Sequence, residues 1–260
     1  MKTNGNTILI TGGGSGIGRA FAEAFHKLGN EVIIAGRRKQ ALDEAATANP
    51  GLETAVLDIE KPAAIKSFAA DITKRFPKLN VVLHSAGIMR AENLLGEEAD
   101  LITVESTIAT NLLGPMRLNA ALLQHLLKQR DGAVLTITSG LAFLPMAITP
   151  TYCATKAAIH SYSQSLRYQL RSTKLQVIEI IPPYVRTGLM GAGQAADERA
   201  MPLDDFIDET MAIITSQDDV AETIVERVKP LRFAAQNGPE KYSAFFKQFN
   251  EAMMAPHTTA

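Results

Sequence analysis

The chain has 260 residues, of which 46% are hydrophobic and 20% are charged, and its formal net charge is −1. This composition excludes a disordered or collagen-like chain, and the near-zero charge gives no electrostatic case for nucleic acid or an anionic membrane as a partner. A single cysteine excludes an internal disulfide and fits a reducing compartment, so we expect a cytoplasmic protein.

The sequence shows no signal peptide, because the first apolar run, at 7–10, is short and leads into glycine. An uncharged stretch at 132–155 is long enough to span a bilayer, but hydroxyl residues, Gly140, Pro145 and Pro150 interrupt it. We interpret this stretch as a strand, a loop and a helix start inside the protein core, and we expect no membrane partner.

Short apolar runs alternate with helical patterns along most of the chain. The runs predict strands at 7–10, 31–35, 54–58, 81–84, 133–138 and 175–181. The helical patterns predict helices at 16–28, 39–48, 62–75, 98–129 and 151–172. Apolar strands separated by helices are typical of a parallel sheet covered on both faces. We therefore expect an α/β fold, a doubly wound Rossmann-type parallel sheet of six or seven strands in a single domain over 1–260.

The pattern changes after Pro182, where glycine, alanine and charged residues become frequent. We expect a substrate loop or lid at 188–216 and a helical C-terminal segment at 217–260. The helices expected in this part lie at 203–214, 218–228 and 239–254, and the residues at 255–260 are expected to fray. No seventh strand is recognisable here.

A glycine-rich run, TGGGSGIG at 11–18, follows the first predicted strand and opens the first helix. A helix N-terminus at the carboxyl end of a strand presents free N–H groups and partial positive charge, so the run predicts a pyrophosphate cradle. A plain tight turn is the alternative. The candidate cradle residues are Gly12, Gly14, Ser15, Gly16, Ile17 and Gly18.

The second predicted strand ends in Gly36, Arg37 and Arg38, where an NAD-binding fold usually carries an acid for the ribose 2′-OH. Two arginines at a helix start oppose the helix dipole, and the 2′-phosphate of NADP between them would remove that conflict. A solvated basic turn is the alternative. Asp58, which ends the third strand, is a candidate to meet the adenine ring edge, although an ordinary turn residue also fits this position.

Tyr152 and Lys156 lie four residues apart near a predicted helix start, and Ser139 ends the fifth strand. A lysine cation beside a tyrosine stabilises the phenolate, so we expect a lowered Tyr152 pKa and proton exchange with a carbonyl or alcohol oxygen near neutral pH. Ser139 can hydrogen-bond the same oxygen. Asn111 disfavours helix slightly, so a specific hydrogen bond and a solvated side chain both fit.

Apolar residues that follow Ser139 and Pro182 are candidates to line a pocket for an uncharged, moderately apolar small molecule, with core packing as the alternative for each. They are Leu141, Phe143, Tyr184, Leu189 and Met190. The five histidines show no metal-ligand spacing, so we expect no metal.

In this order the motifs resemble those of the short-chain dehydrogenase/reductase family. TGGGSGIG matches the family's TGxxxGIG, HSAG at 84–87 stands at its NNAG, and NLLG carries Asn111. Ser139 precedes Tyr152 of YCATK by the expected 13 residues, and IPPYVRT stands at a PGxVxT stretch. The segments SGLAFLPM, SLRYQL and IPPYVRT further resemble a bacterial subgroup of DltE-like oxidoreductases.

The resemblance implies an NADP(H)-dependent oxidoreductase that transfers hydride between nicotinamide and a carbonyl or secondary alcohol. Tyr152 would be the general acid/base, Ser139 would orient the substrate oxygen, and Asn111 would anchor a water linked to Lys156. Lys156 would also lower the Tyr152 pKa and hold the nicotinamide ribose. Further cofactor contacts are implied for Ala86, Gly87, Pro182, Val185 and Thr187, the last two at the nicotinamide carboxamide.

Several positions depart from the family pattern. His84 and Ser85 replace two asparagines, Pro183 replaces a glycine, and Ser15 stands where NADP-preferring members often have a basic residue. NAD(H) is therefore the alternative cofactor, and a catalytically silent NADP-binding sensor or scaffold is the alternative function. We expect a homodimer through the helices 98–129 and 151–172, with a homotetramer as the alternative.

Overall fold

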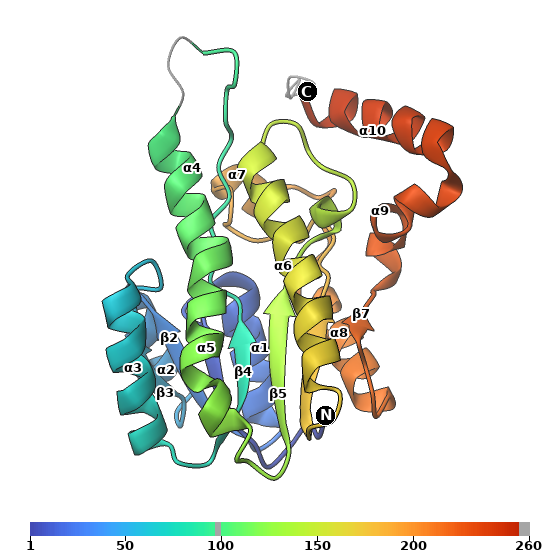
Figure 1. Cartoon of the computed structure of the whole chain (residues 1–260). Helices are drawn as coiled ribbons and strands as arrows, with labels where there is room; N and C mark the ends of the chain where they lie inside the picture. The colour runs from blue at the N-terminus through green and yellow to red at the C-terminus, as the bar shows by residue number, and fades with distance from the viewer. Residues whose placement is uncertain (97–99, 255–260) are drawn as a thin grey trace.

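Seven parallel strands form one sheet in the order β3-β2-β1-β4-β5-β6-β7 (Figure 1). The computed structural model describes residues 1–96 and 100–254. The strands are β1 Thr7–Thr11, β2 Glu31–Gly36, β3 Glu53–Val56, β4 Leu79–His84, β5 Gly132–Ile137, β6 Leu175–Ile180 and β7 Glu222–Thr223. The chain leaves β1 toward one side of the sheet and returns at β4 on the other, and open α/β sheets bind ligands at such a switch point.

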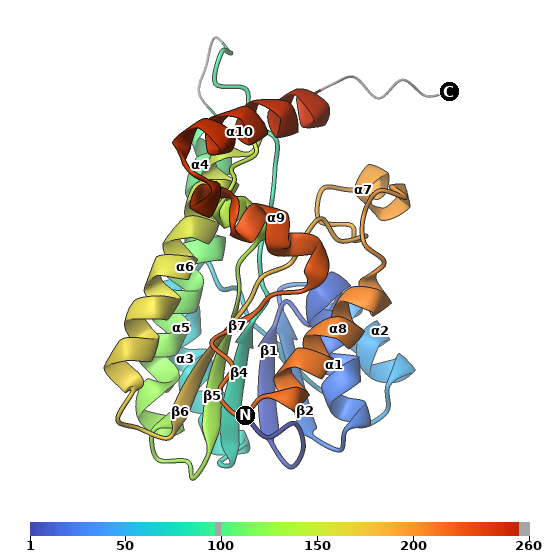
Figure 2. The ribbon, with the colours of Figure 1, turned by 90° about the vertical axis from the view of Figure 1, so that its right-hand side faces the viewer.

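Both faces of the central sheet are buried, which explains the continuous apolar runs of β1 and β2. Ile8 and Ile10 of β1 pack into a core with helices α1, α2 and α8, whereas Leu9 faces a second core under α3, α5 and α6. Figures 1 and 2 show the two helical layers on opposite sides of the sheet. The predicted doubly wound fold is confirmed.

The helices cover the sheet and extend beyond the carboxyl ends of its strands. They are α1 Gly16–Lys27, α2 Lys39–Ala48, α3 Pro62–Arg75, α4 Leu101–Ile108, α5 Gly114–Leu126, α6 Pro150–Leu170, α7 Ala192–Ala196, α8 Leu203–Ser216, α9 Lys229–Arg232 and α10 Pro239–Met254. Short 3-10 turns are η2 Gly140–Ala142, η3 Glu226–Val228 and η4 Ala234–Asn237. The predicted helices 203–214 and 239–254 are confirmed as α8 and α10.

The helix predicted at 98–129 is interrupted by one wider turn. The π-helical segment η1, Ala109–Leu113, separates α4 from α5. Such a turn inserts one residue into the helical ladder and often marks a functional position. Residues 98 and 99 of this prediction lie outside the described residues.

The prediction of a helix at 218–228 is wrong. Glu222 and Thr223 form the edge strand β7, in register with Glu179 and Ile180 of β6, and η3 follows. Backbone bonds from Glu179 to Ala221 and from Ile181 to Thr223 extend the pairing, so the open edge of β6 prevails over the local helical pattern. The sheet thus has its seventh strand. The predicted fraying at 255–260 concerns residues outside the described part.

The uncharged stretch 132–155 becomes β5, a loop and the first turn of α6, as predicted. Among the helices described, none combines the length and apolar character needed to cross a membrane.

Candidate active site

The glycine run forms the tight connection between β1 and α1. Gly12 has φ +70°, and a Cβ on it would lie 2.8 Å from the Cα of Ala86. A Cβ on Gly18 would lie 2.5 Å from the carbonyl oxygen of Gly12, so helix α1 packs directly on the loop. The loop therefore places the first N–H groups of α1 at the carboxyl end of β1.

Thr11 joins this loop to the end of β4. Its hydroxyl oxygen accepts hydrogen bonds from the backbone N–H groups of Ser85 and Ala86, each at 3.2 Å. The predicted cofactor residues Ala86 and Gly87 consequently lie beside the glycine run. A Cβ on Gly87 would lie 3.5 Å from Oδ1 of Asn111 and 4.0 Å from Nζ of Lys156, so this glycine also borders the catalytic candidates.

The two arginines after β2 have different partners. Nη2 of Arg38 donates to the Ser15 hydroxyl at 3.0 Å. The Arg38 guanidinium therefore lies beside Ser15, the position at which NADP-preferring family members often have a basic residue. Nη1 of Arg37 forms a 2.6 Å ion pair with Glu60. Asp58 accepts from the N–H of Glu60 at 3.2 Å and thereby shapes the turn after β3.

Asn111 lies in the π-helical turn and is 2% exposed. Its Nδ2 donates to the Ile88 carbonyl at 2.8 Å, and its Oδ1 accepts from the Ile88 N–H at 2.9 Å. A second contact of Nδ2, at 3.3 Å, reaches the Thr155 hydroxyl on α6. The specific hydrogen bond that the sequence allowed is therefore present, and it joins η1 to the loop after β4 and to the helix of Tyr152.

Ser139, Tyr152 and Lys156 are all buried at the carboxyl end of β5, with exposed fractions of 6–7%. Ser139 begins the turn η2, and its hydroxyl accepts from the Leu141 N–H at 3.1 Å. Nζ of Lys156 donates to the Ile137 carbonyl at 2.7 Å and lies 5.4 Å from the centre of the Tyr152 ring. The three side chains predicted to carry the chemistry therefore converge at one sheet edge.

Burial controls the protonation of this group. It raises the pKa of Tyr152 well above its ordinary value, and the Ser139 hydroxyl acts in the opposite sense without overcoming it. It also lowers the pKa of Lys156 to about 8. The expected lowering of the Tyr152 pKa is thus wrong for the protein alone, because the effect of burial dominates.

The predicted cofactor stretch after β6 closes over the same edge. The Pro182 carbonyl accepts from Gly140 N–H at 2.9 Å, which ties this stretch to the Ser139 turn. From α7, Nε2 of Gln194 donates to the Val185 carbonyl at 2.9 Å and to the Thr187 hydroxyl at 3.3 Å. Thr187 also borders Gly16 of the glycine run.

The candidate pocket residues separate into different surroundings. Leu141 joins a small apolar cluster around Tyr152, whereas the Phe143 ring lies 4.6 Å from the His160 ring and under the Arg232 guanidinium. The Tyr184 hydroxyl donates to Asp197 at 3.1 Å. Leu189 and Met190 are 40% and 37% exposed.

Two contributions to this site were missed in the sequence. The cluster around Tyr152 also includes Phe249 and Met253 of α10, which crosses above α6 in Figure 2. The Glu92 carboxylate accepts from the N–H and hydroxyl of Thr151 and so caps α6 one residue before Tyr152. The aromatic face of 239–254 was a visible signal for α10, but no local pattern pointed to Glu92.

The model of the short chain dehydrogenase family matches residues 6–198. The chain belongs to this family. An uncharacterized oxidoreductase from Bacillus subtilis, DltE, is 37% identical over 253 residues, covering 96% of this chain and 98% of that protein. Dehydrogenase/reductase SDR family member 7B from Bos taurus is 30% identical, covering 84% of this chain and 69% of that protein.

Two solved structures illustrate the shared fold. One is an alcohol dehydrogenase from Thermococcus sibiricus complexed with 5-hydroxy-NADP, with a TM-score of 0.76, 23% identity and coverage of 86% of this chain and 97% of that one. The other is a Burkholderia phymatum enzyme in complex with NAD, with a TM-score of 0.78, 21% identity and coverage of 91% and 95%. Structures of this fold thus hold both kinds of nicotinamide dinucleotide.

The residues of this short-chain dehydrogenase fit a dinucleotide. The Cβ collisions at Gly12 and Gly18 show that only glycine lets the loop pack closely against the end of β4 and the start of α1. This packing brings the N-terminus of α1 to the carboxyl end of β1, where such folds bind a pyrophosphate. Ala86, Gly87 and Thr187 lie next to this cradle. Lys156 lies between Gly87 and the Tyr152 ring. The residues present would therefore hold the cofactor along the carboxyl ends of β1, β2, β4 and β6.

One group of possible metal ligands appears that the sequence spacing did not reveal. The ligand atoms of His160, Glu179 and Glu222 lie within 4.8 Å of one another. Nδ1 of His160 contacts both Glu179 oxygens, at 2.8 and 3.0 Å, and Arg232 donates to both Glu222 oxygens. These carboxylates already have cationic or donor partners, so the group is interpreted as an ion-pair network.

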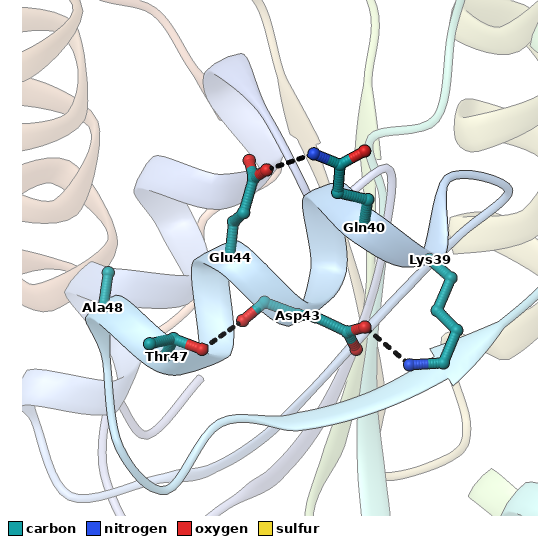
Figure 3. Close-up of a pocket in the computed structure, with 6 residues that line it drawn as sticks. All are labelled: Lys39, Gln40, Asp43, Glu44, Thr47 and Ala48. Atoms are coloured by element: carbon teal, nitrogen blue, oxygen red, sulfur yellow. Dashed lines mark hydrogen bonds and ion pairs between the residues drawn. The ribbon is translucent and has the colours of Figure 1, made fainter.

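A hollow along α2 has no convergent polar groups either. Figure 3 shows its lining side chains bonded within the helix, Lys39 to Asp43, Gln40 to Glu44 and Thr47 to the Asp43 carbonyl. The polar side chains on this surface of α2 are thus bonded to groups of the same helix.

Proposed function

We propose that this protein is an NADP(H)-dependent oxidoreductase that interconverts a carbonyl and a secondary alcohol, with Tyr152 as general acid/base. The observation that carries the proposal is the convergence of buried Ser139, Tyr152 and Lys156 beside the glycine run. A bound nicotinamide would supply or accept the hydride. A buried serine hydroxyl and tyrosine hydroxyl at the same edge can together hydrogen-bond one substrate oxygen.

Burial raises the pKa of Tyr152, so its hydroxyl carries a proton at neutral pH. A tyrosine that keeps its proton at neutral pH can donate it to an oxygen that gains charge as a carbonyl is reduced. Lys156, held by Ile137, would bind the nicotinamide ribose, and Asn111 would keep η1 and the loop after β4 in place.

The surroundings of Tyr152 support an uncharged, apolar substrate. Met89, Met146 and Leu141 pack around its ring together with residues of α10, and they bring no charged group. Leu189 and Met190 belong to the segment 188–202 that we propose as a lid, and its helix α7 is bonded to Val185 and Thr187 through Gln194. The remainder of the expected lid, 203–216, forms α8 and packs in the core, so it is not part of this proposal.

NADP(H) is the proposed cofactor because Arg37 and Arg38, which follow β2, can bind a 2′-phosphate. Arg38 bonded to Ser15 brings a cation to the glycine run itself. Arg38→Ala should weaken NADPH binding at least ten-fold while changing NADH binding less than two-fold, since charge-assisted bonds to phosphate are strong. Equal effects on both dinucleotides would reject the 2′-phosphate assignment.

The catalytic proposal is tested with Tyr152→Phe. We expect loss of turnover with a panel of ketones, aldehydes and alcohols, with NADPH affinity retained. Tyr162→Phe, on the same helix but partly buried against the core cluster under α3, α5 and α6, is the matched control and should keep wild-type turnover. Full activity of Tyr152→Phe would refute the mechanism, and tight NADPH binding without turnover in the wild type would favour a sensor or scaffold.

We further propose a homodimer that associates through α4, α5 and α6, with a tetramer as the alternative, and light scattering of the purified protein tests both. The single cysteine, buried and free at Cys153, supports the cytoplasm as the proposed location.

A further inference from the structure

Glu60 connects the cofactor side of the sheet with the π-helical turn of Asn111. Its Oε1 accepts from Nη1 of Arg37 at 2.6 Å and from the hydroxyl of Thr110 at 2.9 Å. Thr110 is 3% exposed and immediately precedes Asn111. The carboxylate is therefore held from the protein interior and presents a negative charge to Arg37.

The sheet register explains this position. Gly36 pairs with Val56, and Leu57 N–H donates to the Gly36 carbonyl at 3.0 Å, so the ends of β2 and β3 lie side by side. The turn that carries Asp58 and Glu60 thus runs next to the arginines. The side chains of Arg37 and Glu60 keep 51% and 27% exposure, so a ligand can reach the pair.

We propose that Glu60 is a specificity-determining residue that competes with the 2′-phosphate for Arg37 and shifts the cofactor choice toward NAD(H); this inference rests on the proposed function. A 2′-phosphate carries about −1.5 to −2 charges near neutral pH, so a carboxylate beside its binding arginine repels it and occupies a donor that it needs. NAD(H) has a hydroxyl at this position, and a carboxylate can accept a hydrogen bond from it.

The two arginines then have different roles. Arg38, whose partner is the neutral Ser15 hydroxyl, remains available to a phosphate. Arg37 must first break its ion pair with Glu60 before it can bind a phosphate. The enzyme should therefore prefer NADPH only moderately and should also bind NADH.

Glu60→Gln tests this inference, because glutamine keeps the size and can still accept from Arg37 and Thr110 but carries no charge. Binding is measured without substrate, from the fluorescence of NADPH and NADH on titration with protein. We expect the NADPH Kd to fall about five-fold, the size typical of one accessible ion pair, and the NADH Kd to rise or stay within two-fold. Glu44→Gln on α2 removes an equal charge and should leave the ratio of the two Kd values unchanged.

A weaker NADPH affinity or an unchanged Kd ratio in Glu60→Gln would overturn the inference, since Glu60 would then position Arg37 or have no influence. If Arg38→Ala still weakened NADPH selectively, the proposed function would stand. A wild-type protein that bound neither dinucleotide would overturn both.

Discussion

The ammonium group of Lys156 donates a 2.7 Å hydrogen bond to the carbonyl oxygen of Ile137, and both residues are at least 92% buried. One hydrogen bond does not replace the hydration of an ammonium group, so the charged form is disfavoured. Lys156 is thus held in its buried position at a cost in stability.

This cost predicts a pH-dependent stability. Burial lowers the pKa of Lys156 from 10.5 to about 8. Between these values the unfolded lysine holds a proton that the folded one has lost, so the unfolding free energy should rise with pH, by roughly 3 kcal/mol in total. Lys156→Met should lack this rise, as measured by urea denaturation across the window. Lys74→Met, at an exposed position, should keep it; parallel curves for wild type and Lys156→Met would contradict the prediction.

The burial of His84 predicts a second effect of pH on the unfolding free energy, in the acidic range. Its Nε2 lies 2.7 Å from Oδ1 of Asn119, and burial lowers its pKa from 6.5 to about 4. As the pH falls through this range the unfolded histidine gains a proton first, so the unfolding free energy should decrease by roughly 3 kcal/mol and level off below it. His84→Asn should reduce this acid sensitivity in denaturation curves, and His26→Asn, at a partly exposed site, should not.

The central strands were predictable because a strand that is buried on both faces contains a continuous apolar run. Ile8, Leu9 and Ile10 face two different cores, and no other element gives so short an uninterrupted apolar run between turn residues. β7 could not be predicted in this way. A strand of two residues is too short to show an alternating pattern in the sequence. It forms because β6 offers an open edge and because Arg167 donates to the Ala221 carbonyl.

The site residues were predictable as a set, but their electrostatics were not. Spacing placed Tyr152 and Lys156 on one helix face, and strand ends placed Ser139 near them. The direction of the Tyr152 pKa depends on how completely the surrounding residues exclude water, and Phe249 lies almost 100 positions away in the chain. The partner of Arg37 was hidden for the same reason, since Glu60 belongs to a neighbouring strand end.

Glu92 predicts a link between helix stability and catalysis. Thr149 precedes α6 without a side-chain cap, and the Glu92 carboxylate bonds the Thr151 N–H at 3.0 Å and its hydroxyl at 2.6 Å instead. Glu92→Ala should lower the unfolding free energy by about 1–2 kcal/mol and reduce kcat, because the first turn of α6 carries Tyr152. Glu92→Gln, whose single amide oxygen can replace only one of the two carboxylate acceptors, should lie between the two. Unchanged urea denaturation and kcat in Glu92→Ala would show that the cap is dispensable.

Asn250 predicts that α10 shapes the substrate side of the site. Its Oδ1 accepts from the Ala147 N–H at 2.6 Å, and its Nδ2 donates to the Pro145 carbonyl at 3.1 Å. These bonds fasten the helix to the loop between Ser139 and Tyr152, and the side chain is only 7% exposed.

Asn250→Ala should leave buried backbone groups without partners, which costs about 1–3 kcal/mol in unfolding free energy. Because α10 contacts the Tyr152 cluster and the predicted cofactor residues lie on other elements, the substrate KM should rise several-fold while the NADPH Kd stays unchanged. Gln248→Ala, exposed on the same helix, is the control and should match the wild type in both constants. A parallel loss of NADPH affinity in Asn250→Ala would indicate general unfolding of the site, and an unchanged KM would separate α10 from substrate binding.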